Sequence, residues 1–189
     1  MTVLFVNACL RGEESRTLKL CREYLEGLEE VQEVDLAQLR LEPYYGESAA
    51  YRAQLEKDGQ FDDPMFDLGR QFAAADEIVI GAPYWDLSFP AALKVYIEHV
   101  AVMGMVFHYT EEGRCEGLCR AKHLTYITTG GGNVAAANFG YEYLRGIAGM
   151  FGIPEARFAA AENLDVVGAD IEANLDAARA RLAELKATR

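Results

Sequence analysis

The amino-acid sequence predicts an α/β fold in which helices cover both faces of a parallel, five-stranded sheet. Short apolar segments alternate five times with segments of helical periodicity along the 189 residues. The central apolar segments do not alternate between apolar and polar residues, which is typical of strands buried on both faces. No repeat or linker-like stretch interrupts the pattern. We therefore expect a single domain over residues 1–189.

The strands are expected where short runs of apolar residues occur. The first, TVLFVN, lies almost at the amino terminus, and the second, VQEVDL, is more polar and is therefore expected nearer an edge of the sheet. The later runs include EIVIGA and HLTYITT. The five strands are predicted at 2–7, at 31–36, within 76–82, at 123–129 and within 153–161.

The helices are expected between the strands, where apolar residues recur every three or four positions. Two helix starts carry specific signals. Asp62 or Asp63 can cap a helix ahead of Pro64, and Pro90 suits the first position of another helix because proline lacks the N–H that would be unpaired there. The five helices are predicted at 15–28, 62–75, 90–103, 135–150 and 169–186.

Two connecting segments, 40–61 and 104–122, are longer than ordinary loops and rich in aromatic residues. The first contains Tyr45, and the second contains Phe107 and Tyr109. Long aromatic loops in a compact domain are usually functional or interfacial. We therefore expect both segments to contribute to a binding site or to an interface.

The composition excludes several classes of protein. The formal net charge of −12 argues against nucleic acid as a partner, because neutralising phosphates requires a basic surface. No run approaches the roughly 20 apolar residues of a membrane helix, and no signal peptide is recognisable. The four cysteines match no zinc-binding spacing, so we expect free thiols and a cytoplasmic protein. A redox role for Cys115 and Cys119 stays open.

The first candidate binding loop precedes the first helix, which starts with Ser15, Arg16 and Thr17. A helix N-terminus offers unpaired N–H groups and a partial positive charge, and both favour an anion. The loop ACLRGEE contains one glycine and lacks the glycine fingerprint of dinucleotide sites, but a mononucleotide phosphate remains open. The alternative is that Ser15 merely caps the helix.

Two further loops follow strands of the same sheet. After the third strand, Tyr84 and Trp85 provide large flat rings that suit a flat ligand, although such rings also pack in cores and interfaces. After the fourth strand, Gly130–Gly132 permit positive φ and a close approach of the backbone to a ligand, or simply form a flexible turn. Because open α/β sheets bind ligands beyond the carboxyl ends of their strands, we expect the three loops to converge on one ligand.

In combination, these motifs resemble the flavodoxin-like NAD(P)H:quinone reductases and FMN-dependent NADH-azoreductases, over residues 2 to about 162. The motifs that carry the resemblance are SRT, PYWDLSFPAALKVYIEHV, FHYTEEG, TTGGG and FGIP. The resemblance implies a flavodoxin-like sheet of order 2-1-3-4-5 and FMN as the cofactor. It also implies NADH or NADPH as the electron donor, and a homodimer with its active site at the interface.

The resemblance also assigns roles to residues. The FMN phosphate is expected at Ser15, Arg16 and Thr17, with Cys9 in the same loop where relatives often carry serine. The isoalloxazine ring is expected along Pro83, Tyr84, Trp85, Asp86 and Leu87, and its other edge at Thr129, Gly130, Gly131 and Gly132. The walls of the slot for the electron acceptor are expected from Phe107, Tyr109 and Tyr45. No metal and no catalytic acid are expected.

Asp86 is a departure from the family, which often has asparagine at this place. A carboxylate close to the ring would disfavour the anionic reduced flavin, unless Asp86 points to a backbone amide or to solvent.

The expected activity is a ping-pong, two-electron reduction of a quinone, azo or nitroaromatic compound at the expense of NADH or NADPH. Flavin chemistry resides in the cofactor, so the site requires an open aromatic slot more than an acid–base side chain. One alternative is an electron-transfer flavodoxin, although a carrier has no need for the long aromatic segments. The other is a flavin-free sensor or partner protein of the same fold.

Overall fold

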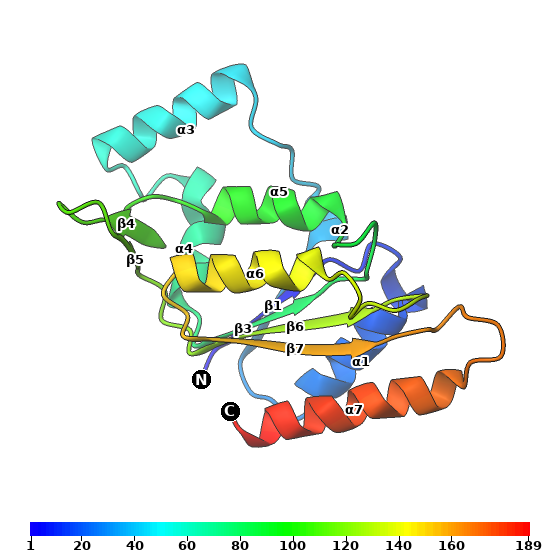
Figure 1. Cartoon of the computed structure of the whole chain (residues 1–189). Coiled ribbons are helices and arrows are strands. Elements are labelled where there is room, and N and C mark those ends of the chain that lie inside the picture. Colours follow the sequence, from blue (N-terminus) through cyan, green and yellow to red (C-terminus); the bar gives the residue numbers. More distant parts are fainter.

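A parallel sheet of five strands in the order β2-β1-β3-β6-β7 runs through the computed structural model, which describes residues 1–189 (Figure 1). The strands are β1 (Val3–Asn7), β2 (Val31–Asp35), β3 (Glu77–Gly81), β6 (His123–Thr129) and β7 (Glu155–Ala161). The predicted parallel sheet of five strands is confirmed. Its numbering differs because β4 (Phe107–Tyr109) and β5 (Cys115–Gly117) form a separate antiparallel hairpin in the segment predicted as a loop.

The strand register brings the carboxyl ends of three central strands to one edge of the sheet. Asn7, at the end of β1, is paired with Gly81, at the end of β3. Gly81 is in turn paired with Ile127, two residues before the end of β6. The loops that follow β1, β3 and β6 therefore leave the sheet side by side.

Helices cover both faces of the sheet, as the sequence predicts (Figure 1). One face packs against α1 and α7, and the other against α4, α5 and α6, as the two main hydrophobic clusters show. These helices are α1 (Arg16–Leu25), α4 (Asp67–Ala74), α5 (Ala91–Val100), α6 (Phe139–Met150) and α7 (Ile171–Ala187). Two further helices are α2 (Leu36–Leu39) and α3 (Gly46–Asp58).

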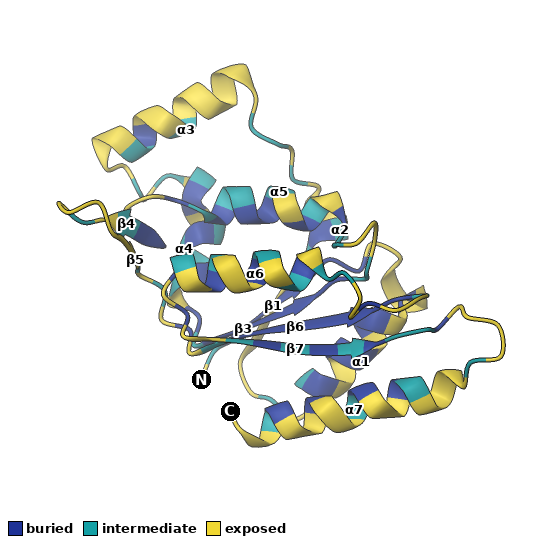
Figure 2. Ribbon diagram, in the orientation of Figure 1, coloured by how far each residue is buried: buried dark blue, intermediate teal, exposed yellow.

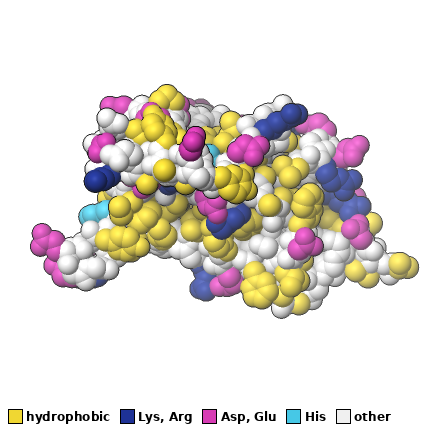
Figure 3. All heavy atoms as spheres, turned by 90° about the horizontal axis from the view of Figure 1, so that it is seen from above, with side chains coloured by type: hydrophobic (Ala, Val, Ile, Leu, Met, Phe, Trp, Pro, Cys, Tyr) yellow, Lys and Arg dark blue, Asp and Glu magenta, His cyan; other side chains and the backbone are white.

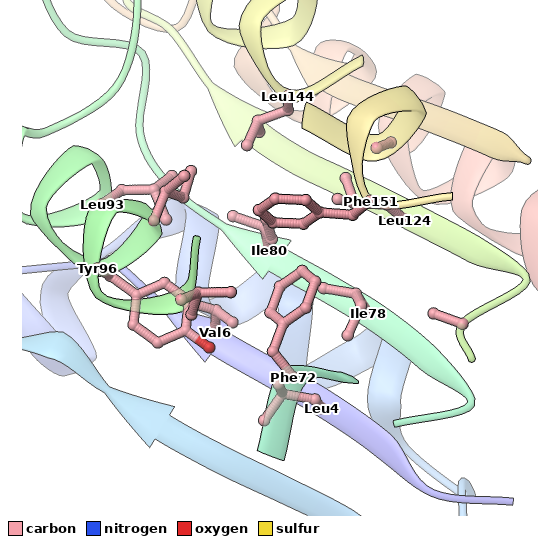
Figure 4. Packing of buried hydrophobic residues seen from close by; sticks show 14 of the residues in the cluster. Leu4, Val6, Phe72, Ile78, Ile80, Leu93, Tyr96, Leu124, Leu144 and Phe151 are labelled. Carbon is pink, nitrogen blue, oxygen red and sulfur yellow. The ribbon is translucent and has the colours of Figure 1, made fainter. Parts of the chain in front are cut away.

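The core lies between the sheet and these helices, and Figure 2 shows the strands buried almost throughout. Figure 4 shows the cluster beneath α5 and α6, in which Leu93 of α5 and Leu144 of α6 lie around Ile80 of β3, and Tyr96 of α5 lies beside Val6 of β1. All five side chains are at most 1% exposed. Since burying a large apolar side chain contributes about 1.5–3 kcal/mol, this cluster holds α5 and α6 firmly on the sheet.

The predicted helices are all present, but most of them are shorter than expected. The segment 62–75 is a 3₁₀ turn at Pro64–Phe66 followed by α4, and Asp63 caps the turn by accepting a 2.9 Å hydrogen bond from the Met65 N–H. Helix α6 begins at Phe139 and not at residue 135, because the side chain of Asn138 caps it. The capping residues thus mark the start of each helix more closely than the apolar periodicity does.

The segment 40–61 contains a helix, α3, where the sequence analysis expects a long loop. Its surface is mostly exposed and only Leu55 is buried, so no apolar face reveals the helix in the sequence (Figure 2). Arg52 fastens α3 to the end of α5 by donating hydrogen bonds to the carbonyl oxygens of Glu98 and Ala101. The expectation of a loop is wrong because the polar contacts of Arg52 and a single buried side chain, Leu55, hold this helix, and neither produces an apolar periodicity.

Candidate functional site

A cavity of about 500 Å³ opens at the carboxyl edge of the sheet, where the loops after β1, β3 and β6 meet. Most of the predicted FMN-binding residues line it together. The lining residues are Leu10, Arg11, Glu14, Ser15, Arg16, Thr17, Pro83, Tyr84, Trp85, Thr129, Gly130, Gly131, Leu164 and Asp165.

Two hydrogen bonds join the three predicted loops. The hydroxyl groups of Thr17 and Thr129 lie 2.7 Å apart and are buried, which connects the start of α1 to the end of β6. The N–H of Tyr84 donates a 3.0 Å hydrogen bond to the carbonyl oxygen of Thr129, which connects the loop after β3 to the same residue. Thr129 therefore connects both neighbouring loops, and the three loops meet at one cavity.

One end of the cavity is formed by the N-terminus of α1. The Ser15 side chain caps this helix by accepting a 3.3 Å hydrogen bond from the Leu18 N–H. The N–H groups of Arg16 and Thr17 find no acceptor within the chain, as expected for the first turn of a helix. With the partial positive charge of the helix end, these groups favour an anion.

The glycines after β6 serve the cavity by their small size. None of Gly130, Gly131 and Gly132 has a positive φ, so the left-handed backbone that glycine permits is not used here. A Cβ atom on Gly130 would collide with the buried Val134, and one on Gly131 would lie 2.5 Å from Oδ2 of Asp165. Gly132 has open space around it and does not line the cavity. Gly130 is therefore the glycine that space requires, because Val134 is buried, whereas the exposed side chain of Asp165 beside Gly131 can move.

The loop after β3 makes a tight turn in which Trp85 and Ser88 exchange two backbone hydrogen bonds of 3.1 and 2.8 Å. The two residues at its tip, Asp86 and Leu87, both have positive φ, 48° and 67°. Such conformations are costly for residues with a side chain and often occur at functional sites. Both tip residues are exposed and lie outside the cavity lining, whereas Tyr84 and Trp85 line it.

Cys9 lies beneath the cavity and does not line it. Its side chain is 2% exposed, and its sulfur is 3.5 Å from the carbonyl oxygen of Gly81. Burial raises the pKa of the Cys9 thiol to about 11. Cys9 therefore packs in the core beneath the loop after β1 and contacts the end of β3.

A fourth loop, after β7, completes the cavity and is missed by the sequence analysis. The N–H groups of Leu164 and Asp165 donate hydrogen bonds of 3.1 and 3.0 Å to the carbonyl oxygens of Gly130 and Gly131. This pairing brings Asp165 within 3.0 Å of the Arg16 guanidinium. The position of this loop could have been predicted, because the loop after the fifth strand also leaves the carboxyl edge of the sheet. Its contact with Arg16 could not.

The predicted acceptor-binding residues lie elsewhere in the same chain. Phe107 and Tyr109 belong to the β4–β5 hairpin, which packs through Gly117 against Gly152, just before the amino end of β7. The hairpin is therefore at the opposite edge of the sheet from the cavity (Figure 1). Phe107 is 7% exposed and Tyr109 is 58% exposed. Tyr45, which is 71% exposed, is the N-cap residue immediately before α3. One chain does not bring these three residues to its cavity.

The family of the chain follows from its sequence together with this geometry. Residues 1–185 match the family model described as "Flavodoxin-like fold". The chain belongs to this family. Two curated relatives of this flavodoxin-like protein cover about nine-tenths of it. An "FMN-dependent NADH:quinone oxidoreductase 2" of Clostridium acetobutylicum is 37% identical over 182 residues, with 90% of each chain covered. An "FMN-dependent NADH:quinone oxidoreductase" of Clostridium perfringens is 33% identical, with 92% of each covered.

Solved structures show the same fold over the full length of this flavodoxin-like protein. An azoreductase from Bacillus anthracis strain Sterne superimposes with a TM-score of 0.83 at 26% identity, with 100% of both chains covered. An FMN-dependent NADH-azoreductase from Bacillus anthracis strain Ames Ancestor, solved in complex with FMN, has a TM-score of 0.81 at 20% identity. The superposition covers 100% of this protein and 99% of that azoreductase.

No helix of this protein is both long and apolar enough to cross a membrane.

Proposed function

We propose that this flavodoxin-like protein is an FMN-dependent NAD(P)H oxidoreductase that reduces quinones, azo compounds or nitroaromatic compounds by two electrons in a ping-pong reaction. The observation that carries the proposal is the meeting of an anion-binding helix end, an aromatic wall and a narrow glycine edge in one cavity. The names of the relatives support the same activity.

The residues that line the cavity fit FMN at both of its ends. The cavity volume of about 500 Å³ falls within the range of roughly 300–1,000 Å³ that is usual for small-molecule sites. The first-turn N–H groups of Arg16 and Thr17 would hold the phosphate. Tyr84 and Trp85 provide an aromatic wall for the ring system, and Gly130 and Gly131 let the backbone approach its edge.

Bound FMN would supply the redox chemistry, since it can accept two electrons from NADH or NADPH and deliver them to an acceptor. The task of the chain is to orient that group. The capped N-terminus of α1 would hold the phosphate end of FMN. The Thr17–Thr129 hydrogen bond fixes the position of this helix end relative to Gly130 and Gly131. Trp85 is 41% exposed at the cavity, which leaves an open aromatic slot for a donor or an acceptor.

We further propose that the working protein is a cytoplasmic homodimer, in which the aromatic residues of one subunit reach the cavity of its partner. Tyr45 and Tyr109 are exposed and lie away from the cavity of their own chain. Figure 3 shows hydrophobic side chains gathered among charged groups on the face that α3 and α5 occupy. Phe107 would support Tyr109 from below, because their rings make an edge-to-face contact at 5.8 Å. The four free thiols agree with a reducing compartment.

Steady-state kinetics test the proposed activity. The FMN-loaded protein should oxidise NADH or NADPH with a soluble quinone as acceptor. Double-reciprocal plots at several quinone concentrations should be parallel, because donor and acceptor use the same slot in turn. An electron carrier would give essentially no turnover with a quinone, and intersecting lines would contradict the shared slot.

A further inference from the structure

The phosphate end of the cavity contains two arginines, and each of them is paired with a carboxylate of the same cavity. Nη1 of Arg16 lies 3.0 Å from Oδ1 of Asp165 and 3.3 Å from the carbonyl oxygen of Leu164. Nη2 of Arg11 lies 3.7 Å from Oε2 of Glu14. The two positive and two negative side chains cancel, so the charged side chains add no net positive charge to an anion site in a chain of net charge −12.

A hydrogen bond and a close contact with Gly131 position Asp165 at the cavity. The Asp165 N–H donates a 3.0 Å hydrogen bond to the carbonyl oxygen of Gly131. The carboxylate lies against Gly131 so closely that an added Cβ atom would come within 2.5 Å of Oδ2. Arg16 extends to it from the first turn of α1, across the cavity wall. The negative charge thus lies against the guanidinium of Arg16 and lines the same cavity as the first turn of α1, whose N–H groups would receive a phosphate.

From this geometry we propose that Asp165 is a specificity-determining residue that competes with the flavin phosphate for Arg16. This inference rests on the proposed FMN site. A phosphate at the N-terminus of α1 either draws Arg16 away from Asp165 or shares it with a second negative charge. Asp165 therefore weakens the binding of flavins that carry a phosphate and leaves the binding of riboflavin, which has none, nearly unchanged.

The size of the effect follows from the exposure of the pair. The side chains of Arg16 and Asp165 are 44% and 72% exposed, so solvent screens their interaction. Exposed ion pairs contribute little, and removing the competing carboxylate should lower the Kd for FMN by roughly fivefold at low ionic strength. The effect should shrink as salt is added.

The single tryptophan, Trp85, gives a direct measure of binding because it lines the cavity. Quenching of its fluorescence is titrated with FMN and, separately, with riboflavin. The variants are Asp165→Asn and Asp165→Ala. The matched control is Asp176→Asn, which changes the net charge equally. The Asp176 side chain is also 72% exposed and pairs with Arg179, outside this cavity.

Both Asp165 variants should tighten FMN binding and leave the Kd for riboflavin within about twofold, whereas Asp176→Asn should change neither. In an Arg16→Gln background the effect of Asp165→Asn should be much smaller. Equal shifts in FMN affinity for Asp165→Asn and Asp176→Asn, or equal shifts for FMN and riboflavin, would overturn the proposal. Weaker FMN binding in the Asp165 variants, or an unreduced effect in the Arg16→Gln background, would also overturn it.

The outcome also separates this inference from the proposed function. Wild-type protein that binds FMN, combined with Asp165 variants that behave as Asp176→Asn does, refutes only the role of Asp165. Wild-type protein that binds neither FMN nor riboflavin refutes the FMN site and the role of Asp165 together.

Discussion

Thr17 and Thr129 share a buried hydrogen bond, 2.7 Å between their hydroxyl oxygens, that connects the first turn of α1 to the last residue of β6. Thr17 is 1% exposed and Thr129 is 9% exposed. The residues come from positions 112 apart in the chain, yet they fix the distance between the phosphate end and the glycine edge of the cavity. The same contact therefore shapes the candidate site and stabilises the folded protein.

Thr129→Val should lower the free energy of unfolding by about 1–3 kcal/mol, because it leaves the buried hydroxyl of Thr17 without its partner. It should also weaken FMN binding. Urea denaturation and flavin titration measure the two effects. Thr128→Val is the matched control, since the neighbouring hydroxyl is buried and makes no hydrogen bond. Equal stability of the two variants would contradict the role given to the Thr17–Thr129 contact.

Gly130→Ala should destabilise the protein by about 1–3 kcal/mol, because the added methyl group collides with the buried Val134 and comes within 3.4 Å of the Tyr84 ring. Gly132→Ala, two residues away, should change stability by less than about 1 kcal/mol, since open space surrounds Gly132 and its φ is not positive. Thermal unfolding compares the two variants. If both alanines were tolerated alike, the glycine edge would not be sterically constrained.

The fold could be predicted from the sequence more completely than the site. Buried strands and capped helices leave local signals, and these predicted the sheet correctly. Helix α3 was missed because one buried side chain, Leu55, and the hydrogen bonds of Arg52 to carbonyl groups at the end of α5 hold it, and these leave no periodic pattern. Asp165 was missed because its role depends on Arg16, a contact across 149 residues. Such pairings come from topology, and spacing along the chain does not reveal them.

The buried thiol of Cys9 should make stability depend on pH in the alkaline range. Its pKa is about 11 in the folded chain against an ordinary value of 9.0, so the unfolded chain loses the proton first. Stability should therefore fall as the pH rises from 9 to 11, by about 2 kcal/mol for this group. In urea denaturation, Cys9→Ser should show a smaller loss over this range than Cys115→Ser, which changes an exposed cysteine. An equal loss in both variants would exclude Cys9 as a cause.

Tyr109→Ala should lower kcat/KM for the quinone and leave FMN uptake unchanged, because this exposed residue lies outside the cavity of its own chain and is proposed to reach that of a partner. A loss of about tenfold corresponds to 1.4 kcal/mol of transition-state binding. Val31→Ala on the edge strand β2, also exposed and outside the cavity, serves as the control. Sedimentation of the wild-type protein as a 20.9 kDa monomer at micromolar concentration would contradict the shared site.

The visible spectrum of the purified protein, recorded with added FMN after removal of the unbound excess and then with anaerobic NADH or NADPH, tests the central claim most directly. We expect the spectrum of bound flavin, and we expect it to bleach when the donor is added. Bound flavin that neither donor can bleach would contradict the proposed oxidoreductase and indicate a carrier. Failure to retain FMN would contradict the assignment of the cavity itself.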